Sequence, residues 1–102
     1  MSRASIAERA PGLFQLAGVL DYRSAPALRE QGGRLIGASQ GAGCVIDCTA
    51  VEKSSSVGLS LLLAFMRDAE AAGKSPQVRG LPQDMRQIAQ VSGLLEVLPL
   101  EA

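Results

Sequence analysis

Two kinds of side chain in this sequence could take part in chemistry: the hydroxyls of Ser54-Ser55-Ser56 and the thiols of Cys44 and Cys48. A serine or cysteine nucleophile needs a general base, and the side chain most often used as that base near neutral pH is His. The sequence contains no His, and no nearby pair of carboxylates supports a metal site at the cysteines. We therefore expect no catalytic residue, no bound metal and no cofactor. Turnover that required Cys44 or Cys48 would instead indicate a small enzyme.

Composition points to a binding module. The chain has 102 residues, of which 47% are hydrophobic, and 10 basic residues balance 10 acidic ones. This length predicts one domain spanning residues 1–102. A net charge of zero argues against nucleic acid as a partner, because neutralising phosphates needs a basic surplus. We expect no signal peptide and no direct insertion into a membrane, since the most hydrophobic run, residues 57–66, is far shorter than the roughly 20 residues of a spanning helix.

The elements that must position these side chains alternate between strands and helices. Apolar patterning and turn residues predict strands over residues 5–9, 13–20, 44–48 and 76–80. Helices are predicted to follow at residues 25–36, 57–72 and 82–92, with a polar connection over residues 49–56. This order predicts an α/β domain with parallel pairing in the middle and the first strand antiparallel at the edge. The apolar run at 44–48 is typical of a central strand that is covered on both faces.

If residues 44–48 form a strand, Cys44 and Cys48 share one of its faces about 13 Å apart. A disulfide requires Cα atoms closer than about 7 Å, so an internal bridge is excluded. Free, buried thiols fit a reducing compartment.

Three charged residues at strand ends are expected to be structural or solvated. Asp21 should shape the turn into the first helix. Asp47 should be a hydrogen-bonded carboxylate on a buried strand, and Arg79 should be solvated.

The triple serine permits two compatible interpretations. Ser55 or Ser56 can cap the unpaired backbone N–H groups of the helix that starts near residue 57. The same helix start, if exposed, can receive a carboxylate or phosphate of a partner.

The helix after the serines carries an apolar arc about 200° wide, whereas covering one face of a sheet needs only about 100°. Leu61 and Phe65 lie one turn apart on one edge of this arc. They either pack under a neighbouring helix or form part of an apolar docking patch beside Ser56. Our hypothesis is that they contribute at least partly to a docking patch.

The segment from Asp47 to Leu59 resembles the signature of STAS domains, the sulphate transporter and anti-sigma factor antagonist family. In that signature a strand ends in Asp-x-Ser/Thr, and a loop leads to a Gly-Leu that opens a helix. Residues 16–21 and 91–94 resemble two further family motifs, so the resemblance covers nearly the whole chain in order. Gly58-Leu59-Ser60-Leu61-Leu62-Leu63 and Val97-Leu98-Pro99 are most similar to the MlaB-type branch of the family.

The resemblance implies a mixed sheet of four to five strands with helices packed mainly on one face. It also implies a non-enzymatic, cytoplasmic subunit of an MlaFEDB-type phospholipid ABC transporter, which maintains outer-membrane lipid asymmetry. Its partners would be the MlaF-like ATPase and, through it, the MlaE-like permease, which would hold the chain at the inner membrane. The residues expected to contact the partner are the helix start and its apolar flank: Ser55, Ser56, Val57, Gly58, Leu61 and Phe65.

The alternative implied by the same family is an anti-sigma factor antagonist that binds an anti-sigma kinase. That branch carries Asp-Ser-Ser-Gly, in which the serine before the glycine accepts phosphate, and here the matching residues are Ser55, Ser56, Val57 and Gly58. Because Val57 has no hydroxyl, the usual phosphoacceptor is missing. Ser56 is the remaining candidate phosphoacceptor.

Overall fold

The computed structural model describes residues 4–101, which form four strands, three α-helices and one short 3-10 helix. The helices and strands follow in the order β1 (Ser5–Ala10), β2 (Leu13–Leu20), α1 (Ala25–Ala38), β3 (Cys44–Ser54), α2 (Ser56–Ala71), β4 (Pro76–Arg79) and α3 (Gln83–Val91), with the 3-10 helix at Leu95–Val97. This order confirms the predicted alternation of strands and helices.

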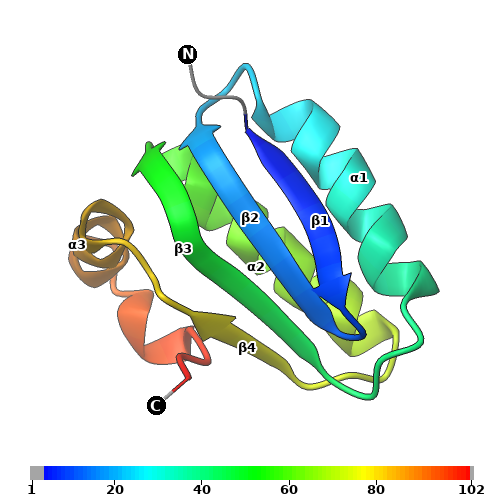
Figure 1. Ribbon diagram of the computed structural model, residues 1–102. Coiled ribbons are helices and arrows are strands. Elements are labelled where there is room, and N and C mark those ends of the chain that lie inside the picture. The colour runs from blue at the N-terminus through cyan, green and yellow to red at the C-terminus, as the bar shows by residue number, and fades with distance from the viewer. Residues whose placement is uncertain (1–3, 102) are drawn as a thin grey trace.

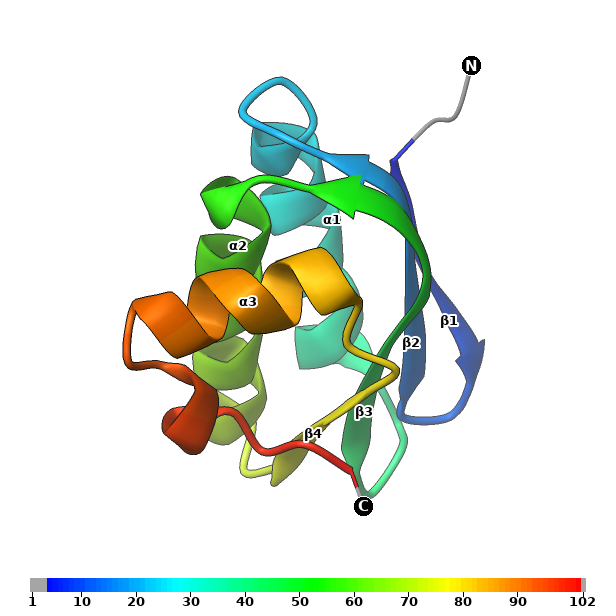
Figure 2. The same ribbon diagram turned by 90° about the vertical axis from the view of Figure 1, so that its left-hand side faces the viewer.

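The strands form one mixed sheet in the order β1-β2-β3-β4 (Figure 1). β1 pairs with β2 in antiparallel fashion at the edge, and the β2–β3 and β3–β4 pairs are parallel, as predicted. The three α-helices lie on one side of the sheet (Figure 2). This arrangement is the α/β architecture that the family resemblance implied.

The sheet has one covered and one open face, which corrects the expectation that the third strand is covered on both faces. Along β3, Cys44, Ile46 and Cys48 are buried, whereas Val45 and Asp47 between them remain partly exposed. Since the helices lie on one side only, the alternate residues of each strand face solvent.

β3 is also longer than predicted, because residues 49–54 continue the strand instead of forming a loop. The second half of β2 pairs with this stretch through Ala17–Ala50, Gly18–Val51 and Leu20–Ser54, with shifts in register that accommodate extra residues. The exposed side chains of Thr49, Glu52 and Lys53 explain the polar sequence of this stretch, whereas Val51 and Ser54 are buried. The strand therefore delivers Ser54 directly to the start of α2.

α2 lies between its two helical neighbours and contacts both. One core cluster joins the covered face of the sheet to α1 and α2 and contains Leu62 and Phe65. A second cluster joins α2 to α3 and the C-terminal segment and contains Leu59, Ala89 and Leu98. The wide apolar arc of α2 thus packs against the sheet, α1 and α3.

The C-terminal segment covers the outer edge of β4. The N–H of Val78 donates to the carbonyl of Pro99 at 2.9 Å, and the N–H of Glu101 donates to the carbonyl of Val78 at 2.8 Å. A single bridge between Val78 and Leu100 forms there, so the sheet has four strands and no regular fifth one among residues 4–101. An edge whose backbone groups are paired in this way is protected from pairing with another chain.

At the end of the sheet opposite the starts of α1 and α2, a carboxylate joins two turns. Glu8 Oε2 accepts from the N–H of Gly12 at 3.0 Å and from the hydroxyl of Ser39, and Ser39 Oγ in turn accepts from the N–H of Gly41. These contacts tie the β1–β2 turn to the loop between α1 and β3. Because both hydrogen bonds favour the ionised carboxylate, they lower the pKa of Glu8, with the backbone bond from Gly12 contributing most.

Candidate partner-binding site

The start of α2 is exposed and capped by a serine. Ser55 is the N-cap residue: its Oγ accepts from the N–H of Val57 at 3.2 Å, and its carbonyl accepts from the N–H of Gly58 at 3.0 Å. The capping role predicted for Ser55 or Ser56 thus falls to Ser55. Ser55 and Ser56 are exposed and Val57 is half-buried, so the three predicted residues lie together on the surface.

Three elements hold this helix start in place through Ser54 and Ser55. The N–H of Ser54 donates to Asp84 Oδ2 of α3 at 2.9 Å, and the hydroxyl of Ser54 donates to the carbonyl of Ser55 at 2.8 Å. The N–H of Ser55 donates to the carbonyl of Leu20, the last residue of β2, at 3.1 Å. The backbone that presents Ser56 to solvent is therefore fixed by β2, β3 and α3 together.

Gly58 lies beneath the surface of the site. It is buried, and a Cβ at this position would overlap Ser54 Oγ and press on Leu20 Cδ1. The glycine allows α2 to pack closely on the ends of β2 and β3, so we expect it to contribute by position and not by contact with a partner.

Phe65 does not reach the surface, which corrects its place in the predicted docking patch. Its side chain is 0% exposed and lies against Gly32 of α1, where it fills the space that a Cβ at position 32 would occupy. Of the two interpretations of the apolar edge of α2, Phe65 follows the first and packs under a neighbouring helix. Leu61, at 4% exposed, also belongs to the core.

Leu61 nevertheless forms part of a shallow hollow between the starts of α1 and α2. The hollow has a volume of about 380 Å³, and most of its lining is apolar. Four residues line it from the α1 side, namely Tyr22, Ala25, Pro26 and Arg29. Four residues line it from the α2 side, namely Val57, Ser60, Leu61 and Ala64. It adjoins the serine cap through Val57.

The β2–α1 turn fixes the outer rim of this hollow. Asp21 Oδ1 accepts from the N–H groups of Arg23 at 2.9 Å and of Ser24 at 3.0 Å, which confirms that Asp21 shapes the turn. Tyr22, held between them, is 70% exposed, and the guanidinium of Arg23 lies 5.6 Å from the centre of its ring. Such a large exposed aromatic side chain is typical of a protein interface.

The α2 side of this hollow has a recognisable spacing in the sequence. Val57, Ser60, Leu61 and Ala64 follow the i, i+3, i+4, i+7 spacing of one helix face. The α1 side, by contrast, comes from residues about 35 positions away, and only the packing of α1 against α2 brings it into place. An ion pair across the two helices, Arg29 to Asp68 Oδ2 at 2.6 Å, closes the far end.

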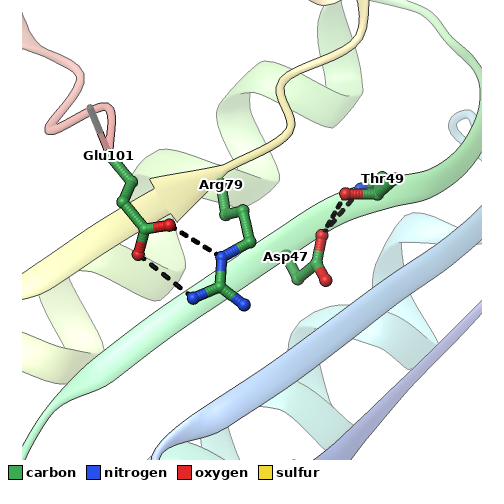
Figure 3. A network of polar contacts seen from close by, with 4 residues as sticks. All are labelled: Asp47, Thr49, Arg79 and Glu101. Carbon is green, nitrogen blue, oxygen red and sulfur yellow. Dashed lines mark hydrogen bonds and ion pairs between the residues drawn. The ribbon is translucent and has the colours of Figure 1, made fainter.

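A cluster of polar side chains lies on the open face of the sheet (Figure 3). Asp47 Oδ1 accepts from the N–H and hydroxyl of Thr49, so its side chain is hydrogen-bonded as predicted although the strand is open on that face. Arg79 is not simply solvated, because its guanidinium donates to both carboxylate oxygens of Glu101 at 2.8 and 3.2 Å. These hydrogen bonds lower the pKa of Glu101 and raise that of Arg79.

The described residues contain no cluster of three or more His, Cys, Asp or Glu side chains that could hold a metal ion. Cys44 and Cys48 are free and buried on the same side of the sheet. Burial raises the pKa of the Cys48 thiol to about 12 and also raises that of Cys44, which disfavours the reactive thiolate.

The described part of the chain contains no helix with the length and apolar character needed to cross a membrane. A family model described as Mlab, STAS domain matches residues 5–99. The chain belongs to the STAS domain family. Among curated proteins, none matches the chain at a significant level.

Solved structures of other STAS domains share this fold. An anti-sigma factor antagonist from Mycobacterium paratuberculosis is 26% identical with a TM-score of 0.76, and the match covers 98% of this chain and 85% of that one. The anti-sigma factor antagonist SpoIIAA in its unphosphorylated form is 19% identical with a TM-score of 0.73, with 98% and 89% covered. The phosphorylated form of SpoIIAA from Bacillus is 19% identical with a TM-score of 0.67, with 98% and 92% covered.

Proposed function

We propose that this STAS domain is a non-catalytic subunit that binds and supports the ATPase of an MlaFEDB-type phospholipid ABC transporter. The match to the Mlab family model over residues 5–99 carries this proposal. In this role the domain lies on the cytoplasmic side of the inner membrane, and the ATPase with its permease holds it there. The transporter would maintain the lipid asymmetry of the outer membrane.

The start of α2 supports a role in binding a protein. Ser55, Ser56 and Val57 are presented on a backbone that β2, β3 and α3 hold rigidly. The first turn of α2 contains no acidic residue, so its positive end is not compensated by the helix itself. A carboxylate of a partner placed there would interact favourably with the helix dipole.

The absence of a hydroxyl at residue 57 favours the transporter role over a phosphorylation switch. In the anti-sigma antagonist pattern the phosphoacceptor directly precedes the glycine, and this chain has Val57 there. This surface would then bind its partner constitutively, without control by a kinase.

Affinity purification tests the proposal. The tagged chain is expressed in its native host, membranes are solubilised in mild detergent, and the bound proteins are identified by mass spectrometry. We expect an ABC ATPase together with its permease. Val57→Glu should abolish their recovery, because the new carboxylate at the start of α2 would repel a carboxylate of the partner. Gln87→Glu, on the exposed face of α3, is the control and should not change the recovery. Recovery of a sigma-regulatory kinase in place of an ATPase would contradict the proposal.

The second candidate function is an anti-sigma factor antagonist, and the 26% identical antagonist from Mycobacterium paratuberculosis favours it. The exposed Ser56 hydroxyl is then the candidate phosphoacceptor. Incubation with the cognate kinase and ATP should phosphorylate the wild-type chain and leave Ser56→Ala unmodified. Absence of phosphate on the wild-type chain, with the kinase active on its own substrate, would exclude this regulation.

A further inference from the structure

The backbone N–H of Ser54, the last residue of β3, cannot be paired by a neighbouring strand. The next N–H along the chain, that of Ser55, donates to the carbonyl of Leu20 in β2 at 3.1 Å. Because successive N–H groups of a strand point to opposite edges, that of Ser54 points to the edge on the β4 side. β4 pairs with residues 44–47 of β3 and therefore ends well before this point. The N–H of Ser54, whose residue is buried, needs an acceptor from elsewhere.

A carboxylate from α3 supplies this acceptor. Asp84 Oδ2 accepts from the N–H of Ser54 at 2.9 Å, and Asp84 Oδ1 accepts from the N–H of Met85 at 2.8 Å. Met85 is fully buried in the core cluster, which anchors the first turn of α3 and with it the carboxylate. A hydrogen bond to a charged acceptor is stronger than one between neutral groups. The end of β3 is therefore tied to α3 by a strong and well-anchored contact.

The position of Ser54 determines the position of the helix cap. Its hydroxyl donates to the carbonyl of Ser55 at 2.8 Å, and the same carbonyl accepts from the N–H of Gly58 at 3.0 Å. The side chain of Ser54 also packs tightly against Gly58, where a Cβ would overlap its Oγ. Ser55 in turn caps the N–H of Val57. A shift of Ser54 would therefore move the cap together with Ser56 and Val57, the residues that we assign to the partner.

We propose that Asp84 is a positioning residue for partner recognition, which acts through Ser54 and makes the orientation of Ser56 and Val57 depend on α3. Asp84 exerts this effect through its hydrogen bond to the end of β3 and not by contact with the partner. A site held in its binding geometry before the partner arrives loses less conformational entropy on binding. The inference rests on the proposed function for the binding of a protein at the start of α2, and it adds a residue of α3 to the determinants of that binding.

Two substitutions separate the hydrogen bond of Asp84 from its charge. Asp84→Asn and Asp84→Ala both remove the negative charge, but asparagine keeps a carbonyl oxygen that can accept from the N–H of Ser54. Ser39→Ala is the matched control, because it removes hydrogen bonds to Glu8 and Gly41 at the opposite end of the sheet. Amide hydrogen exchange of each purified full chain, followed residue by residue with NMR, measures local opening. Circular dichroism verifies that each variant folds.

We expect Asp84→Ala to accelerate exchange of the Ser55 and Val57 amides about tenfold, because the junction loses a charged acceptor. The amide of Ile46, in the buried part of β3, should exchange as in wild type. Asp84→Asn should restore slow exchange at the cap, and Ser39→Ala should leave it unchanged. Equal acceleration at Ile46 would indicate a merely structural role and overturn the inference, as would unchanged exchange at Ser55 and Val57.

Affinity purification from the native host provides the second readout and separates this inference from the proposed function. Asp84→Ala should lower the amount of bound partner about tenfold, whereas Asp84→Asn and Ser39→Ala should retain it. An ABC ATPase recovered equally by Asp84→Ala and wild type would support the transporter role and overturn the inference. A different bound protein that is lost with Asp84→Ala and retained with Asp84→Asn would support the inference and contradict the transporter role.

Discussion

The ring of Phe65 in α2 lies directly against Gly32 of α1, and the two residues fit only because position 32 has no side chain. A Cβ at this position would overlap Cε1 and Cζ of the ring and would also approach Ile6 of β1. The closeness of α1 and α2, and hence the shape of the hollow between their starts, depends on this pair.

Gly32→Ala is therefore expected to lower the free energy of unfolding by about 1–3 kcal/mol, the usual cost of overpacking a core, although alanine favours helix formation. Urea denaturation of the purified protein measures the change. Gly37→Ala in the same helix is the matched control, since a Cβ there meets nothing within 4 Å. The control should be neutral or stabilise the protein by up to about 1 kcal/mol. Equal effects of the two substitutions would contradict the packing argument.

Ser55→Ala should destabilise the protein by about 1 kcal/mol, because the N–H of Val57 loses its capping acceptor. Ser56→Ala, one residue further on, should change stability by less than about 0.5 kcal/mol, because Ser56 is exposed and is not the capping residue. Thermal denaturation of both variants provides the comparison. If Ser56→Ala proved the more destabilising, the assignment of the cap to Ser55 would be wrong.

Glu8 should make stability depend on pH in the acid range. Hydrogen bonds from Gly12 and Ser39 hold its pKa below the ordinary value of 4.5, so the carboxylate stabilises the fold above that pH. The contribution is lost as the pH falls through the lowered pKa of the folded protein. Glu8→Gln should thus be less stable than wild type at pH 7, and the difference should shrink towards pH 3.

Urea denaturation of both proteins between pH 7 and pH 3 checks this prediction. Glu70→Gln at an exposed position of α2 controls for the general effect of removing a carboxylate. A difference for Glu8→Gln that stays constant over the whole range would show that its ionisation is not coupled to folding.

The two thiols should be unreactive in the folded protein. Burial raises the pKa of Cys48 to about 12, and both cysteines lie under the helices. Iodoacetamide at pH 8 is expected to modify neither residue in the native state and both after unfolding in guanidinium, as counted by mass spectrometry. Rapid labelling of either thiol in the native protein would reveal an opening of the sheet–helix core.

The sequence predicted the order of elements because turn residues and apolar spacing are local signals. The strand over residues 49–54 was not predicted, because the exposed side chains of this stretch are polar. Only the pairing of β2 with β3 makes these residues a strand. Phe65 was misplaced because the apolar arc of α2 does not reveal that both α1 and α3 flank the helix.

The sequence identifies only the part of the candidate site that is continuous in the chain. Ser55, Ser56 and Val57 are contiguous, so a local motif identifies them. The wall formed by Tyr22, Pro26 and Arg29 depends on a tertiary contact between helices, and no local pattern encodes which residues of α1 would face α2.

The placement of both helix starts at one end of the sheet leaves the loop over residues 39–43 at the other end (Figure 2). Gly43 is exposed there, and a Cβ at this position meets nothing within 4 Å. Since the native thiols are buried, Gly43→Cys would carry a single fluorophore far from any protein bound at the serine cap. Its slower tumbling in fluorescence anisotropy would then report complex formation without obstructing it.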